Sequence, residues 1–214
     1  MTKYEALINQ ATELRVNHRP KPAIRKYKRA RAIGGPRDRE ISQMIGVSYK
    51  MRRKYALALV WYYQSLQGAS TYETGNIKRD IAEVYSRLKE NDHAIELLSQ
   101  SLVVLTYESY PEENGITVGF LARVELRQGD LEAAMLHFAE ADAKLEQGSN
   151  RHFELYNKLY YAHALSRCGQ REEAVAVAEK ALQLAATYGS WKHCLRAKVL
   201  LRFGYLGDIL LGHR

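Results

Sequence analysis

The sequence has little proline and cysteine and no long apolar run. Only 4 of its 214 residues are proline and 2 are cysteine. So few prolines leave room for long helices, and Cys168 and Cys194 alone cannot build a disulfide framework. No run of about eighteen apolar residues could span a bilayer, and the amino terminus lacks the apolar core of a signal peptide. We therefore expect a mainly helical, soluble protein of the cytoplasm with no membrane partner.

The motifs of the common enzyme classes are also missing. There is no GxxxxGK phosphate loop, no GxSxG nucleophile turn, and no HExxH or CxxC ligand pair. The 7 histidines are scattered. The spacings of His163 from Cys168 and of His193 from Cys194 do not make a chelating pair on a helix. We expect no catalytic residue, no metal site and no cofactor, and hence no enzyme.

An internal repeat is what the chain does have. Its frame has four positions: a small residue, an alanine twelve residues later, a third residue four positions after the alanine, and a small residue three positions after that. The third residue is large in four of the five copies. Small residues let helices approach closely and the large one fills the remaining gap, so the frame predicts antiparallel helix pairs. Turn residues such as Gly129 and Asp130, a ready N-cap, fall between the paired helices. The five copies are Ala11, Ala23, Tyr27, Ala30; Gly46, Ala58, Tyr62, Ser65; Ala82, Ala94, Leu98, Ser101; Ala122, Ala134, Phe138, Ala141; and Ala162, Ala174, Ala178, Ala181.

Two of the copies resemble tetratricopeptide repeats. The segment "IGVSYKMRRKYALALVWYYQSL" and its successor "IAEVYSRLKENDHAIELLSQSL" match the family's L-G-x2-Y, A-x3-F and final small residue. The family's first-helix tryptophan is absent, and extra residues separate the later copies. The resemblance implies an all-α, right-handed superhelical solenoid of about five helix pairs with a carboxyl-terminal capping segment. It implies one domain over residues 1–214, with repeats near 4–37, 39–68, 75–104, 115–147 and 155–187 and a terminal helix near 190–212.

In this family a peptide or protein partner binds in the concave groove that the first helices of the repeats line. Ile8 and Thr12 stand where chaperone-binding members need Lys and Asn, so that function is not expected. Basic residues near the ends of the first helices, Arg15 and Lys50 among them, also have a structural explanation, because a cation there offsets the helix dipole by about 0.3–1 kcal/mol. The resemblance implies these groove residues: Arg79, Glu83, Arg87, Arg123, Arg127, Tyr156, His163 and Arg167.

Charge is concentrated at the amino-terminal end. Residues 1–54 hold 15 Lys and Arg against 4 Asp and Glu, a net charge of +11, and the rest of the chain is slightly acidic. Such a surface favours an acidic protein, a nucleic acid or an anionic surface. The expected function is therefore a peptide-binding scaffold that favours acidic ligands. The alternative is a nucleic-acid-associated regulator that contacts phosphate. The expected basic patch comprises Lys21, Arg25, Lys28 and Arg29.

The carboxyl-terminal end departs from the repeat. From Leu200 onward Arg202 and Asp208 are the only charges before the last two residues, and residues 189–214 are apolar at positions that include Leu195, Val199, Leu200, Phe203, Leu206, Ile209 and Leu210. A terminal helix normally shows water a polar outer face, so an apolar one favours self-association. We expect this segment to cap the core, either alone or together with formation of a homodimer through Leu206 and Leu210.

Overall fold

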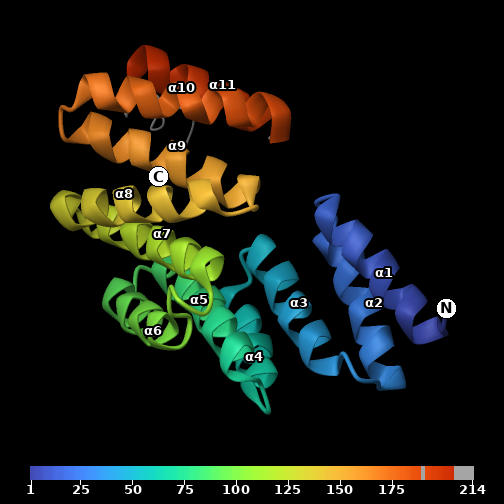
Figure 1. The fold of residues 1–214 in the computed structure, drawn as a ribbon. Helices are drawn as coiled ribbons and strands as arrows, with labels where there is room; N and C mark the ends of the chain where they lie inside the picture. Colours follow the sequence, from blue (N-terminus) through green and yellow to red (C-terminus); the bar gives the residue numbers. More distant parts are fainter. Residues whose placement is uncertain (189–190, 205–214) are drawn as a thin grey trace. The chain divides into compact units, whose positions relative to one another are not determined.

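The computed structural model describes residues 1–188 and 191–204, and within them it contains helices and no strands (Figure 1). No described helix is long and apolar enough to cross a membrane. The helices are α1 (Lys3–Val16), α2 (Pro20–Ile33), α3 (Asp38–Met51), α4 (Tyr55–Leu66), α5 (Thr71–Arg87), α6 (Asn91–Val104), α7 (Pro111–Gln128), α8 (Leu131–Gln147), α9 (Arg151–Arg167), α10 (Arg171–Tyr188) and α11 (Trp191–Phe203).

Several of these helices start at the capping residues that the sequence supplies. Thr2 and Glu5 form a capping box at α1, because each side chain accepts the backbone N–H of the other residue. Ser70 and Glu73 do the same at α5. At α8 the side chain of Asp130 accepts the N–H of Ala133, as expected of an N-cap.

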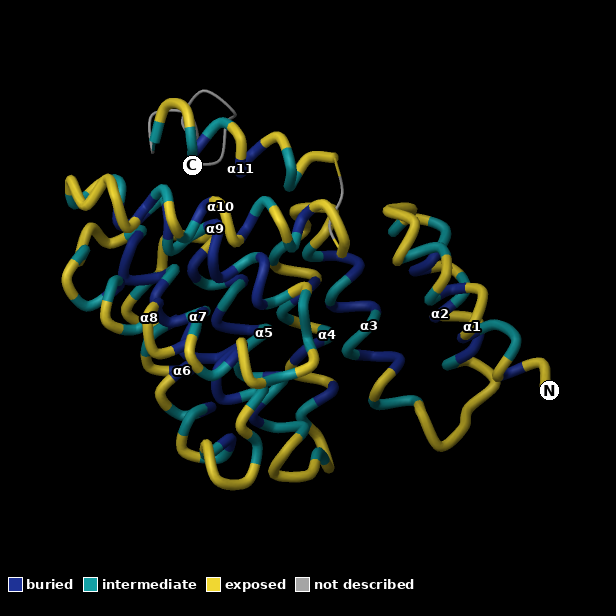
Figure 2. Tube along the Cα trace, turned by 45° about the horizontal axis from the view of Figure 1, so that its top comes forward, coloured by how far each residue is buried: buried dark blue, intermediate teal, exposed yellow. Residues whose placement is uncertain are grey.

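The helices form five consecutive pairs, α1 with α2 through α9 with α10, followed by α11. Every residue of the four-position frame is buried in all five copies, from Ala11 in α1 to Ala181 in α10. Figure 2 shows buried stretches, in dark blue, alternating with exposed ones along the helices. The all-α repeat fold predicted from the frame is confirmed.

The turns inside the five pairs share one geometry. Each contains one residue with a left-handed backbone, and the next residue's N–H donates to the carbonyl five positions back, at 2.8–3.1 Å. This is the Schellman arrangement that closes a helix end. Three of the left-handed residues are not glycine, so the fold holds them in a conformation that ordinary side chains disfavour. The five are His18, Arg53, Lys89, Gly129 and Gly169.

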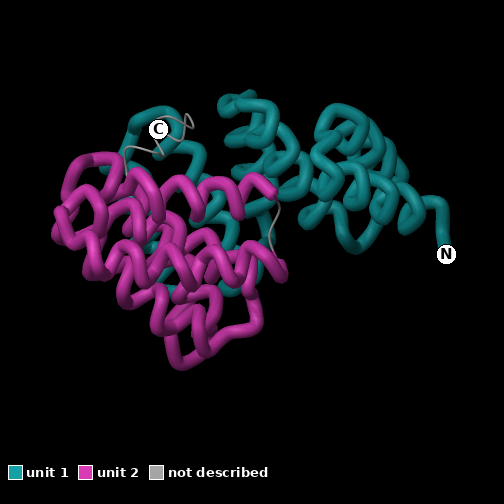
Figure 3. The backbone as a smooth tube through the Cα atoms, turned by 90° about the horizontal axis from the view of Figure 1, so that it is seen from above, with its two compact units in different colours: residues 1–104 teal, residues 105–214 magenta. Residues whose placement is uncertain are grey.

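The chain divides into two compact units, residues 1–104 with α1–α6 and residues 105–214 with α7–α11 (Figure 3). In unit 1 two fully buried tyrosines, Tyr27 and Tyr62, occupy the third position of the frame. Gly46 makes room for the second of them, since a Cβ at this glycine would lie 2.8 Å from the Tyr62 ring. The glycine therefore stands where two helices meet too closely for any side chain.

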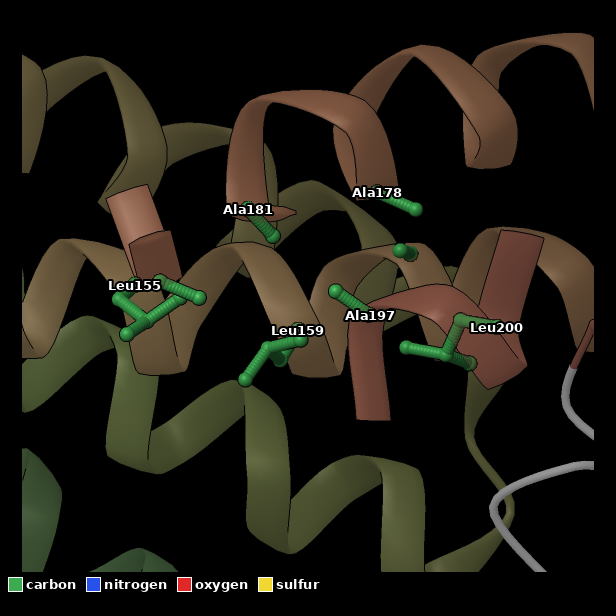
Figure 4. Packing of buried hydrophobic residues seen from close by; sticks show 8 residues of the cluster. Leu155, Leu159, Ala178, Ala181, Ala197 and Leu200 are labelled. Carbon is green, nitrogen blue, oxygen red and sulfur yellow. The ribbon is translucent and has the colours of Figure 1, made fainter. Parts of the chain in front are cut away.

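The core of unit 2 extends into α11. Leu155 and Leu159 of α9 pack in one cluster with small residues of α10 and with Ala197 and Leu200 of α11 (Figure 4). All of them are nearly or fully buried. A second cluster joins α7 and α8 around Phe138. Helix α11 thus covers the end of the repeat core with its own apolar side chains.

Candidate functional site

The first helices of the second and third pairs carry a charged cluster. Nζ of Lys50 in α3 lies 3.0 Å from Asp80 Oδ1 and 2.7 Å from Glu83 Oε2 in α5. Gln43 donates to the other oxygen of Asp80 at 3.0 Å. Burial alone would lower the pKa of Lys50, but the two carboxylates hold that pKa well above its ordinary value. The cluster ties two neighbouring first helices together.

The predicted groove residues of unit 1 lie on or beside this cluster. Glu83 accepts from Lys50, and Arg87 lies 3.8 Å from Glu83 with 39% of its side chain exposed. Arg79 donates to Asn76 Oδ1 at 2.7 Å and is partly buried. These side chains are held in place by neighbours of the same chain. The sequence predicted where they stand on the helix and did not predict these partners within the chain.

A cavity of about 470 Å³ opens between α1 and α3 in the same unit. Its charged lining residues are Arg15, Arg37, Glu13 and Glu40, and Arg37 pairs with Glu40 through two hydrogen bonds. Nε of Arg15 is buried and, among the described residues, has no hydrogen-bond partner. The remaining lining residues are polar or apolar: Asn9, Thr12, Val16, Asn17 and Met44.

In unit 2, two arginines stack on aromatic rings of the first helices α7 and α9. The guanidinium of Arg123 in α7 lies 3.6 Å from the centre of the Phe120 ring and 5.4 Å from that of Tyr160 in α9. Arg196 of α11 lies 4.4 Å from the Tyr160 ring and is itself buried. Such stacks are worth about 0.5–1 kcal/mol where exposed and more where water is excluded. The predicted residue Arg123 is thereby held in one position.

Aromatic and histidine rings gather around Tyr156, another predicted residue. The rings of His152 and His193 lie 4.8 and 5.1 Å from that of Tyr156, and 5.9 Å from each other. Burial lowers the pKa of His152. This ring cluster joins α9 to α11, and sequence reasoning missed it, because His193 lies outside the repeat frame.

The other predicted groove residues of unit 2 are Arg127, His163 and Arg167. Arg127 of α7 and His163 of α9 are partly exposed. Arg167 is exposed, and its guanidinium donates to the carbonyl of Leu126 near the end of α7, at 3.2 Å. That bond satisfies a carbonyl that helix geometry leaves open, so Arg167 has a structural function at a helix end.

The predicted basic patch lies on α2, a second helix, and all four of its residues, Lys21, Arg25, Lys28 and Arg29, are exposed. Nζ of Lys28 lies 5.6 Å from the centre of the Tyr49 ring and 5.3 Å from that of Trp61. Leu206 and Leu210 lie outside the described residues. Within the residues that are described, no group of three or more His, Cys, Asp and Glu is placed to hold a metal ion.

Comparison with known proteins gives matches to solved structures only. No family model matches the sequence, and the search of curated proteins gives no match. One match is a structure of TPR-like repeats, nearly identical to one another, from a putative kinesin light chain of Podosopora anserina. Its sequence is 17% identical to this chain, the TM-score is 0.65, and the match covers 87% of this chain and 97% of that one. The fold is of the tetratricopeptide-repeat type. The motif resemblance is thus confirmed.

Longer proteins with this tetratricopeptide-type fold match over nearly the whole chain. A Rap protein in complex with Competence and Sporulation Factor has a TM-score of 0.85 at 15% identity, covering 96% of this chain and 60% of that one. The Rap conjugation gene regulator of plasmid pLS20, in complex with the Phr* peptide, has a TM-score of 0.83 at 15% identity, covering 99% and 63%. This chain therefore spans less than two thirds of either Rap chain.

Proposed function

We propose that this chain is a non-enzymatic scaffold of the cytoplasm that binds a peptide or a segment of a protein on its first helices. The observation that carries the proposal is the cavity between α1 and α3, which is lined by polar and charged side chains of two first helices. One protein of the same fold is in complex with a peptide. Tetratricopeptide-type folds in general place their binding residues on these helices.

The side chains on these helices suit peptide binding physically. Interface residues that dominate affinity are most often Arg, Tyr and Trp, held in place by their neighbours before the partner arrives. Arg123 is already stacked on Phe120, and Tyr156 already packs against two histidine rings. Little side-chain entropy remains to be lost on binding. In addition to the residues that line the α1–α3 cavity, we propose further partner contacts on the first helices α5, α7 and α9, where Arg123 and Tyr156 are already held in place: Arg79, Glu83, Arg87, Arg123, Arg127, Tyr156, His163 and Arg167.

A display selection tests the proposal. The full chain is used as bait for random twelve-residue peptides, and enriched peptides are titrated by fluorescence anisotropy. We expect micromolar binding that Arg123→Ala or Arg79→Ala weakens at least about tenfold, which is about 1.4 kcal/mol. The matched control is Arg29→Ala, an exposed arginine on a second helix. No enriched peptide, or an equal loss in the control, contradicts the proposal.

The second candidate function is phosphate binding by the basic patch. It is favoured by the exposure of Lys21, Arg25, Lys28 and Arg29 together on one helix. Nucleic-acid binding would show a steep linear fall of log affinity with log salt, because each neutralised phosphate releases counterions. A peptide held mainly by apolar and polar contacts, with few ion pairs, would respond less to salt, because it neutralises fewer charges. Titration of a fluorescent duplex DNA at two salt concentrations separates the two.

We also propose that the carboxyl-terminal segment forms a homodimer through Leu206 and Leu210, since the sequence there is apolar where a capping segment should be polar. Sedimentation velocity at tens of micromolar should show a dimer. The double variant Leu206→Glu, Leu210→Glu should be monomeric. A monomeric wild-type chain at that concentration excludes the dimer.

A further inference from the structure

The repeat frame makes Arg15 and Lys50 equivalent residues. Each lies four positions after the buried small residue of its first helix, Ala11 in α1 and Gly46 in α3. Because the pairs have the same internal spacing, the two cations belong at the same place on successive first helices. Their surroundings can therefore be compared position by position.

Lys50 has two carboxylate partners on the next first helix. Asp80 and Glu83 lie two positions before and one position after Ala82, the small residue of α5. The same two positions of α3, counted from Gly46, hold Met44 and Val47. Neither of these residues has a charge. At these two positions α3 therefore offers the cation of the first pair no carboxylate.

The structure shows the consequence of this difference. Nε of Arg15 is buried without an acceptor among the described residues, and Met44 lines the cavity beside Arg15. A buried guanidinium N–H that makes no hydrogen bond costs about 1–3 kcal/mol, and an ionised group costs more than a neutral one. Nε itself has almost no accessible surface, so a ligand in the cavity reaches it once the Arg15 side chain turns toward the cavity, and an acceptor there recovers this free energy. The cavity of about 470 Å³ leaves room for one.

We propose that Arg15 binds the carboxylate of an aspartate or glutamate side chain in the bound peptide; this inference rests on the proposed peptide-binding function. A planar guanidinium pairs well with a carboxylate, which offers two oxygens in the same plane. Within the cavity Arg37 is already paired with Glu40, so Arg15 is the cation that a ligand can neutralise.

The other lining residues favour this ligand over a phosphate or a chain terminus. Glu13 and Glu40 also line the cavity and would repel a doubly charged phosphate more than a singly charged carboxylate. Polar side chains line it on both sides of Arg15, with Asn9 before it in α1 and Asn17 after it, just past the end of that helix. A peptide backbone that continues past Arg15 in both directions can hydrogen-bond to both. The chain of a peptide that ends in the bound carboxylate would continue in one direction only and would leave Asn9 or Asn17 without a contact.

Proton–nitrogen NMR of arginine side chains in the full chain tests the inference directly. The Nε–Hε resonance of Arg15, assigned by its loss in Arg15→Gln, is followed while the capped tripeptide Ac-Ala-Glu-Ala-NH2 is added. We expect a saturable shift, and at least tenfold weaker binding of Ac-Ala-Gln-Ala-NH2. No saturable shift, or an equal shift with the glutamine peptide, overturns the inference. A stronger shift with inorganic phosphate, or with Ac-Ala-Gln-Ala, whose carboxyl terminus is free, overturns the assignment to a side-chain carboxylate.

A charge placed inside the chain gives a second, independent test. Met44→Asp restores the carboxylate that α5 carries at Asp80, so it should pair with Arg15 and abolish the shift with the glutamate peptide. Asparagine has nearly the same shape as aspartate but no charge, so Met44→Asn should retain the shift with the glutamate peptide. Thermal denaturation by circular dichroism confirms that both variants are folded. If Met44→Asp folds and still binds the glutamate peptide, the inference is contradicted. If Met44→Asp does not fold, the titration of the wild-type chain alone tests the inference.

The two proposals fail in different ways. Selected peptides that lack an acidic preference, and that bind Arg15→Gln as tightly as the wild type, overturn the assignment to Arg15 and leave the peptide-binding function intact. If the Arg15 resonance shifts saturably with the glutamate tripeptide but the display selection enriches no peptide, the carboxylate site at Arg15 stands and the peptide-scaffold function is overturned.

Discussion

Replacing Lys50 with methionine should destabilise unit 1 strongly. The substitution preserves the length of the side chain and removes the charge that faces Asp80 and Glu83 at 3.0 and 2.7 Å. Removing one partner of a buried ion pair costs about 3–5 kcal/mol, because the remaining charges stay buried without compensation. The three side chains retain 17–22% of their surface exposed, so we expect the lower end of that range, about 3 kcal/mol.

The pH dependence of this loss has a definite sign. The folded chain raises the pKa of Lys50 above the ordinary lysine value of about 10.4. The stabilisation is therefore fully present below that pH and is lost as the pH rises through the folded pKa. The difference in unfolding free energy between wild type and Lys50→Met should stay constant from pH 7 to about 10 and shrink above it.

Urea denaturation followed by circular dichroism measures this difference. The matched control is the triple variant Lys50→Met, Asp80→Asn, Glu83→Gln, which removes all three charges together and should recover more than half of the loss. A loss below about 1 kcal/mol for Lys50→Met would mean that the cluster behaves like a surface ion pair. A triple variant no more stable than Lys50→Met would refute the electrostatic explanation.

Three further substitutions test other contacts of the fold. Ala134→Leu should destabilise the folded chain by about 1–3 kcal/mol, since this fully buried alanine packs between helices. Ala139→Leu, on the exposed face of the same helix, should change stability little, and the midpoints of urea denaturation compare the two variants. Met44→Asp should melt at a higher temperature than Met44→Asn, and the difference should vanish in an Arg15→Gln background; an equal melting temperature of the two variants would mean that Arg15 gains nothing from a carboxylate. His137 shares a hydrogen bond of 2.7 Å with Glu125, which raises the pKa of the histidine above the ordinary value of about 6.5. Its stabilisation is therefore full below that pH and lost as the pH rises through the folded pKa, so His137→Gln should be less stable than wild type at pH 5.5 and approach it by pH 8.5 in urea titrations; a constant difference would contradict this.

The sequence predicted the packing inside each helix pair well, for a physical reason. Close approach of two helices restricts residue size at fixed spacings, so Gly46 under Tyr62 and Ala134 beside Phe138 are visible as a pattern. The shared turn geometry keeps those spacings constant from copy to copy.

Contacts between successive pairs were much less visible. Whether the cation of a first helix meets a carboxylate depends on residues some thirty positions further along, as with Lys50 and Asp80. The frame alone offered no reason to single out Arg15 over Lys50 as a ligand-binding residue. The stacking of Arg196 on Tyr160 was also missed, because α11 lies beyond the last copy of the frame.

Binding of the partner on the first helices is tested most directly by comparing two variants with one selected peptide at two salt concentrations. In the first, Lys21, Arg25, Lys28 and Arg29 are all changed to Glu; in the second, Arg79 and Arg123 are changed to Ala. We predict that binding is lost in the second variant at both salt concentrations and retained in the first, with unchanged helicity in each. Loss only in the charge-reversed variant, with a steep salt dependence, would contradict binding on the first helices and support phosphate binding by the basic patch.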